Sequence, residues 1–75
     1  MKPRLSSISS RGVLKALQRA GFYVDRQSGS HVILKRDRDR KRVTVPYHAA
    51  DLYKGVVHSI LAQAGMTVQE FLSFL

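Results

Sequence analysis

Apolar residues near the start of the chain recur at the spacing of a helix and form one stripe along it. The stripe consists of Val13, Leu14, Ala16, Leu17 and Ala20. Ser9 or Ser10 can cap the start of this helix, and Gly21 can end it in a left-handed conformation. Such an ending brings Leu17 into contact with Phe22. The pattern therefore predicts a helix from about residue 10 to residue 20.

A second helix is predicted over residues 54–64, again followed by a glycine, Gly65. Its apolar positions are Val56, Val57, Ile60, Leu61 and Ala64. Thr67 and Glu70 then have the spacing of a capping box, in which each side chain bonds the other residue's backbone amide. This pair predicts a last short helix over residues 68–74.

Between the helices, the pattern of apolar residues predicts three strands, at residues 22–26, 31–36 and 42–45, joined as an antiparallel meander. Pro46 ends the third strand, because proline cannot donate to a ladder of hydrogen bonds. Side chains alternate between the faces of a sheet. The residues predicted to face the core are Val32, Leu34, Val43 and Val45. Those predicted on the opposite face are His31, Ile33, Lys35, Arg42 and Thr44. The fold class is α+β.

The length of 75 residues predicts one domain, residues 1–75. The polar, serine-rich segment 1–8 is expected to be mobile, with Leu5 and Ile8 able to pack onto the domain. There is no cysteine, so no disulfide framework or thiolate metal site is expected. Three scattered histidines do not have ligand spacing, and no metal or cofactor is expected. The N-terminus lacks the apolar core of a signal peptide, and no apolar run is long enough to span a membrane. We expect a cytoplasmic protein.

The formal net charge is +8, which favours nucleic acid or an acidic protein as partner. Residues 35–42 hold six basic and two acidic residues, and this segment alone carries half of the net charge. A phosphate-binding surface and a solvated hairpin tip both explain such a segment. The charge therefore indicates the class of partner and leaves the role of the segment open.

His31 follows the turn-forming pair Gly29-Ser30 and begins an apolar strand. A histidine can accept or donate a proton near neutral pH. RNA carries its own nucleophile, the 2′-OH, which a neutral imidazole can deprotonate without a metal. The alternative is a strand-edge histidine with a structural hydrogen bond, and the residues alone leave both possibilities open.

Several short motifs, in this order and spacing, resemble the HicA toxins of HicA/HicB toxin–antitoxin systems. They are Gly21-Phe22, Gly29-Ser30-His31, Val43-Thr44-Val45-Pro46 with His48, and Lys54-Gly55 leading into the segment 59–65. The resemblance covers residues 9–75. It implies a fold like the double-stranded RNA-binding domain, with both long helices on one face of the sheet. It also implies a ribosome-independent mRNA endonuclease whose essential histidine corresponds to His31, inhibited by the antitoxin HicB.

The long charged turn departs from the family pattern, and Tyr47 and His58 have no role that the resemblance assigns. The residues expected to bind RNA are Ser30, Lys35, Arg36, Arg42 and Lys54. His48 suits a turn-stabilising bond at least as well as catalysis. Tyr23 and Tyr47 can stack on bases or cover the sheet edge.

The expected partners are mRNA and a HicB-like antitoxin, with no membrane, and the free toxin is expected to be a monomer. A non-catalytic RNA-binding module is the alternative function. His31 distinguishes the two, because a binding module has no need of an imidazole at this position.

Overall fold

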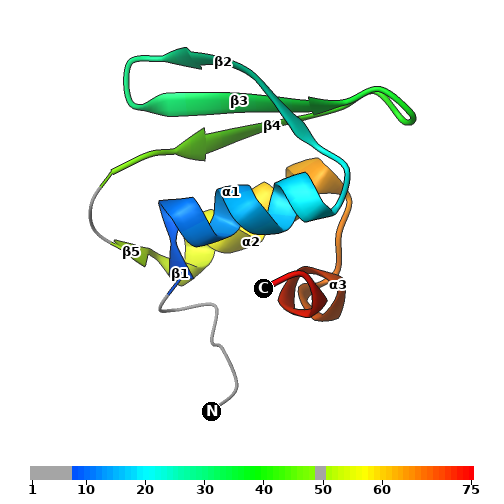
Figure 1. Cartoon of the computed structure of the whole chain (residues 1–75). Helices are drawn as coiled ribbons and strands as arrows, with labels where there is room; N and C mark the ends of the chain where they lie inside the picture. The colour runs from blue at the N-terminus through cyan, green and yellow to red at the C-terminus, as the bar shows by residue number, and fades with distance from the viewer. Residues whose placement is uncertain (1–7, 49–50) are drawn as a thin grey trace.

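The computed structural model describes residues 8–48 and 51–75 of the chain. Its elements are β1 (Ile8–Ser9), α1 (Ser10–Arg19), β2 (Tyr23–Ser28), β3 (His31–Arg36), β4 (Lys41–Pro46), β5 (Asp51–Leu52), α2 (Lys54–Ala64) and α3 (Val68–Ser73). Strands β2, β3 and β4 form an antiparallel sheet in that order, and β1 pairs with β5 in a separate two-stranded sheet (Figure 1).

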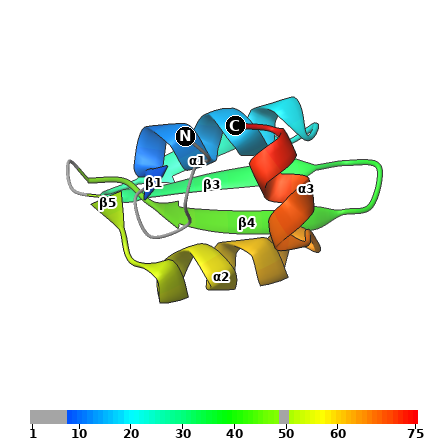
Figure 2. The ribbon, with the colours of Figure 1, turned by 90° about the horizontal axis from the view of Figure 1, so that it is seen from below.

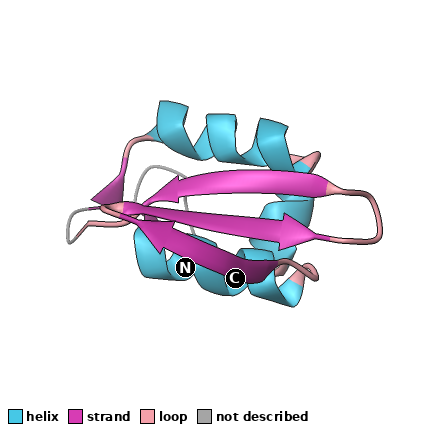
Figure 3. Ribbon diagram, turned by 90° about the horizontal axis from the view of Figure 1, so that it is seen from above, coloured by secondary structure: helices cyan, strands magenta, loops and turns pink. Residues whose placement is uncertain are grey.

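Helices α1 and α2 lie side by side under one face of the three-stranded sheet, and α3 lies across their ends (Figure 2). Seen from the other side, the strands lie in front of the helices (Figure 3). No element among the described residues covers this second face, which we call the open face. The predicted α+β fold, with both long helices on one side of the sheet, is confirmed.

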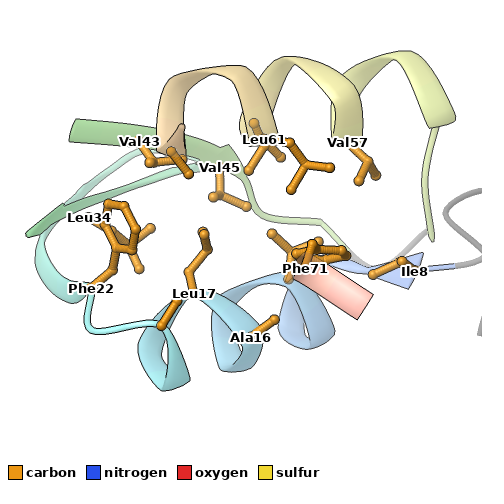
Figure 4. Close-up of a cluster of buried hydrophobic side chains, with 14 of the residues drawn as sticks. Ile8, Ala16, Leu17, Phe22, Leu34, Val43, Val45, Val57, Leu61 and Phe71 are labelled. Carbon is orange, nitrogen blue, oxygen red and sulfur yellow. The ribbon is translucent and has the colours of Figure 1, made fainter. Parts of the chain in front are cut away.

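The core lies between the sheet and the two long helices (Figure 4). Leu34, Val43 and Val45 are fully buried, and Val32 is nearly so, as the alternation of side chains predicts. Their partners in the core come from every helix and include Leu17, Val57, Leu61 and Phe71. Because a chain of this size has one small core, each of these side chains contributes a large part of the stability.

Local hydrogen bonds at the helix ends explain where the helices begin and stop. The Ser9 hydroxyl accepts from the Gly12 amide at 3.0 Å and caps α1. At the other end of α1, Gly21 has a φ of 101°, and the Phe22 amide donates to the Leu17 carbonyl at 3.0 Å. The predicted capping box of α3 is present, with Thr67 and Glu70 bonding each other's backbone amides.

The predicted bounds of two strands, of the last helix and of the mobile segment were wrong. The last helix spans Val68–Ser73 rather than 68–74. The first strand spans Tyr23–Ser28 rather than 22–26, because Phe22 turns into the core and a β-bulge between Val24 and Arg26 adds a residue to the strand. The third strand extends by a residue at each end, to Lys41–Pro46. Ile8, predicted within a mobile segment, is 5% exposed because it pairs with Leu52 and fills the core. The rest of that segment, residues 1–7, lies outside the described residues.

Candidate nucleic-acid interface

The open face of the sheet brings together charged and polar residues from all three long strands. In an antiparallel sheet, residues directly opposite each other point to the same face. The cross-strand pairs on the open face are Ser28–His31, Arg26–Ile33 and Tyr23–Lys35 between β2 and β3, and His31–Pro46, Ile33–Thr44 and Lys35–Arg42 between β3 and β4. The face predicted from the alternation is thus the one that His31 occupies.

His31 is the first residue of β3, directly after the two-residue turn Gly29-Ser30, and its side chain is exposed. Gly29 has a φ of 57°, a conformation that glycine adopts without strain. The Tyr47 amide donates to the Ser30 carbonyl at 2.6 Å and extends the ladder beyond Pro46, the partner of His31. The imidazole therefore stands on a backbone that is held from both neighbouring strands.

Ser10, the first residue of α1, fixes this end of the sheet to the helix layer. Its side chain is buried, its hydroxyl donates to the Pro46 carbonyl at 2.8 Å, and the same oxygen accepts from the His48 amide at 3.4 Å. Since Pro46 lies opposite His31, one serine hydroxyl connects α1 to the strand beside the imidazole.

Arg26 is the cation that sequence analysis missed on this face. The bulge lets Arg26 pair with Ile33, which makes it a diagonal neighbour of His31. Diagonal neighbours lie about 7–8 Å apart, within reach of an arginine side chain. Counting back from the turn, with Ser28 opposite His31, would have placed Arg26 on the open face. Strict alternation counted forward from Phe22 instead places Arg26 on the core face, because it does not allow for the extra residue of the bulge.

Lys35 and Arg42 lie opposite each other at the far end of the open face from His31. The four steps along the strand from His31 to Lys35 span roughly 13 Å, at about 3.3 Å per residue. The Lys35 ammonium is 3.5 Å from an Asp25 carboxylate oxygen. Because both side chains are partly exposed, this ion pair contributes little to the stability of the protein. Tyr23, opposite Lys35, donates its hydroxyl to Asp37 at 3.0 Å, and this bond raises the pKa of Tyr23.

A comparison with protein families matches residues 10–66 to the family described as "HicA toxin of bacterial toxin-antitoxin". The match covers most of the 75 residues, from the start of α1 to just beyond α2. This chain belongs to the HicA toxin family. A search of curated proteins finds no match.

Arg36 of this HicA toxin is not part of the open face, although it was expected to bind RNA. It lies on the helix side of the sheet, 8% exposed, and its guanidinium donates to the Ala20 carbonyl at 2.9 Å and to both Asp39 carboxylate oxygens at 3.0 and 2.7 Å. The same group lies 4.4 Å from the centre of the Phe22 ring. The hydrogen bonds from Arg36 lower the pKa of Asp39, and the guanidinium is occupied by contacts within the protein.

The other two residues expected to bind RNA lie apart from each other. Ser30 is exposed in the turn beside His31. Lys54 is exposed at the first residue of α2, in the helix layer, and the structure does not bring it to the open face. His58 is exposed on the same helix.

No group of three His, Asp or Glu side chains in residues 8–48 and 51–75 is arranged to hold a metal ion. None of the described helices is long and apolar enough to cross a membrane.

Proposed function

We propose that this HicA toxin is an endoribonuclease in which His31 transfers the proton that cleavage requires. The observation that supports the proposal most directly is the position of His31, exposed on a rigid strand end, on a face that also presents Arg26, Lys35 and Arg42. A polyanion bound along these cations would pass the imidazole. The opposite face is closed by the helices and cannot receive it.

The chemistry needs no metal ion because RNA supplies the nucleophile. Neutral His31 takes the proton of a 2′-OH, the 2′-oxygen attacks the adjacent phosphorus, and the 5′-oxygen of the next nucleotide leaves with a proton from water or from the imidazolium. The products are a 2′,3′-cyclic phosphate and a 5′-hydroxyl. One general acid–base group contributes roughly 10²–10⁴-fold to a rate. Arg26, diagonal to His31, is placed to stabilise the charge that develops on the nonbridging oxygens.

The decisive experiment compares His31→Ala with wild type and with His58→Ala. Both histidines are exposed, so each substitution is expected to change the free energy of unfolding by less than about 0.5 kcal/mol. We expect wild type and His58→Ala to cleave RNA in EDTA and to arrest growth when expressed alone. His31→Ala is expected to do neither, yet to bind RNA with wild-type affinity. A 2′-deoxy nucleotide at the cleaved position should block cleavage by wild type.

Two results would contradict the proposal. Cleavage by pure His31→Ala would remove the imidazole from the reaction. A wild-type protein that binds RNA and never cuts it would instead establish the RNA-binding module that the sequence left as the alternative.

We also propose that a HicB-like antitoxin inhibits the toxin by covering the open face. Membership of a toxin–antitoxin family calls for a protein partner. An acidic surface would complement the cations around His31 and speed association. In a saturated complex, amide exchange of residues 29–36 should slow relative to the free toxin. Unchanged exchange there, in a complex that is inactive, would show that inhibition acts from another surface.

A further inference from the structure

The end of the β3–β4 hairpin forms a pocket of about 380 Å³ that the reaction at His31 does not use. Its lining residues are Lys35, Arg36, Asp37, Arg40, Lys41 and Arg42, and we call it the hairpin pocket. It lies at the opposite end of β3 from His31, where the hairpin loop projects from the sheet (Figure 1).

The acidic residues of the hairpin are already bonded within the protein. Asp39 accepts two hydrogen bonds from Arg36, and Asp37 accepts one from Tyr23. Arg36 is thereby neutralised. The Lys41 side chain extends over Gly65, with its ammonium at the C-terminal end of α2, where the helix dipole favours a cation. Contacts within the protein thus engage both acidic residues and two of the cations, Arg36 through hydrogen bonds and Lys41 through its position at the end of α2.

Three cations of the hairpin pocket are left to face a ligand. Lys35 and Arg42 lie directly opposite each other on the open face, and like charges in that arrangement repel. The partly exposed Asp25 relieves Lys35 only weakly. Within the described residues, neither Arg40 nor Arg42 has an acidic partner within 4.0 Å. An anion bound between these side chains would relieve the repulsion.

The backbone of Arg40 supplies an independent observation. Arg40 is the last residue of the four-residue turn, and its φ of 54° is left-handed, a conformation that glycine adopts without strain and arginine does not. It is the only residue other than glycine with a positive φ in the described part of the chain. Strained backbone concentrates where a side chain has a function. Arg40 therefore places a positive charge at a turn position where backbone conformation alone would favour glycine.

We propose that the hairpin pocket binds a backbone phosphate of the RNA strand whose cleaved bond lies at His31. This inference rests on the proposed function. The roughly 13 Å from His31 to Lys35 exceeds the reach of one phosphate, so the bound phosphate belongs to a nucleotide further along the strand. The toxin would then act on single-stranded RNA of a minimum length, lying along β3 across the open face.

The test compares two substrates that share the same cleaved bond: a dinucleoside monophosphate and a ten-nucleotide RNA. Arg40→Gly is the informative variant, because it removes the charge and the strain together and should raise the melting temperature. Lys15→Ala, on the exposed side of α1, is the matched loss of one positive charge. Steady-state cleavage and the salt dependence of binding are measured for each protein.

For wild type, we expect kcat/KM to be at least tenfold higher for the ten-nucleotide RNA than for the dinucleotide. Arg40→Gly should lose about tenfold on the long substrate, through KM, and nothing on the short one. Its binding to the ten-nucleotide RNA should lose about 0.7 from the log–log slope against salt, the share of one phosphate. Lys15→Ala should match wild type on both substrates.

The outcomes separate the inference from the proposed function. If wild type cleaves both substrates equally well, or if Arg40→Gly keeps the wild-type preference, the hairpin is a solvated tip and the inference is overturned. If no protein cleaves either substrate, the proposed function fails. Binding of the ten-nucleotide RNA still decides the pocket in that case: an unchanged affinity and salt slope in Arg40→Gly overturn it, and the expected losses support it.

Discussion

Replacing Arg36 with alanine should lower the stability of the toxin without removing a contact to RNA. The side chain is nearly buried and donates to the Ala20 carbonyl and to both oxygens of Asp39, while its guanidinium covers the Phe22 ring. Alanine would leave the Ala20 carbonyl without this donor and Asp39 without its counterion.

The expected loss of unfolding free energy is about 2–3 kcal/mol. Hydrogen bonds to charged groups contribute about 1.5–3 kcal/mol, and a cation over an aromatic ring about 0.5–2 kcal/mol. These contributions are not additive, and solvent weakens the pair because the Asp39 side chain is 33% exposed. Arg36→Lys should recover only a small part of the loss, because an ammonium cannot form the two parallel bonds to Asp39.

Urea denaturation followed by far-UV circular dichroism measures the change. With a slope of about 1 kcal/mol per molar urea, the midpoint should fall by about 2–3 M. Arg42→Ala is the matched control: its side chain is exposed on the open face, so its midpoint should stay close to wild type while RNA binding weakens. A wild-type midpoint in Arg36→Ala together with weaker RNA binding would refute the structural role and restore the sequence-based assignment.

Four further substitutions test other parts of the structure. Arg36 holds the pKa of Asp39 below its ordinary value of 3.8, so the stability that ionised Asp39 contributes is present above that value and is lost as the pH falls through the lowered pKa. Asp39→Asn should therefore lower the free energy of unfolding at pH 7. It should also make that free energy fall less steeply between about pH 5 and pH 2 in urea titrations, and a fall as steep as in wild type would contradict this. Gly65→Ala should cost about 1–2 kcal/mol, because φ is 67° and the new Cβ would lie 2.8 Å from the Lys41 side chain, whereas Gly55→Ala, inside α2 with open space around it, should stabilise by up to about 1 kcal/mol. Equal thermal shifts for the two glycine variants would argue against the left-handed helix end. Ser10→Ala should cost about 1–2 kcal/mol in chemical denaturation, because the Pro46 carbonyl loses a buried donor, and a wild-type midpoint would show that water replaces the hydroxyl.

The sequence was sufficient for the parts of the fold that depend on local chemistry. The apolar stripes, the glycines at the helix ends and the Thr67–Glu70 pair each act within a few residues, and the structure confirms the helices they predict. Alternation along β3 and β4 placed His31 on the face opposite the core because both strands are regular. The sequence indicated only that Ile8 is able to pack onto the domain, because its burial depends on Leu52, far along the chain.

For the candidate site, the alternation placed Lys35 and Arg42 on the face of His31, and the same period of two places Arg36 on the core face. Arg36 was nevertheless expected to bind RNA, because it is adjacent to Lys35 in sequence and equally basic. The sequence does not show that Arg36 packs over the Phe22 ring and donates to Ala20 and Asp39. Arg26 was missed for a related reason, because a bulge has no reliable mark in a single sequence. The roles assigned to His31, Lys35 and Arg42 stay predictions until the variants are measured.

The alternation along β3 also affects how such a toxin can change over time. Val32, Leu34 and Arg36 face the helix layer, while His31 and Lys35 face outward on the same six residues of backbone and Ile33, between them on the open face, is only 7% exposed. Substitutions at His31 and Lys35 alter the surface that RNA or an antitoxin meets and change the stability of the fold little, since both side chains are exposed or partly exposed. Substitutions at the inward positions do the reverse. The surface of the toxin can therefore change at the two ends of this outward row, without the compensating changes in packing that a buried position such as Ile33 would require.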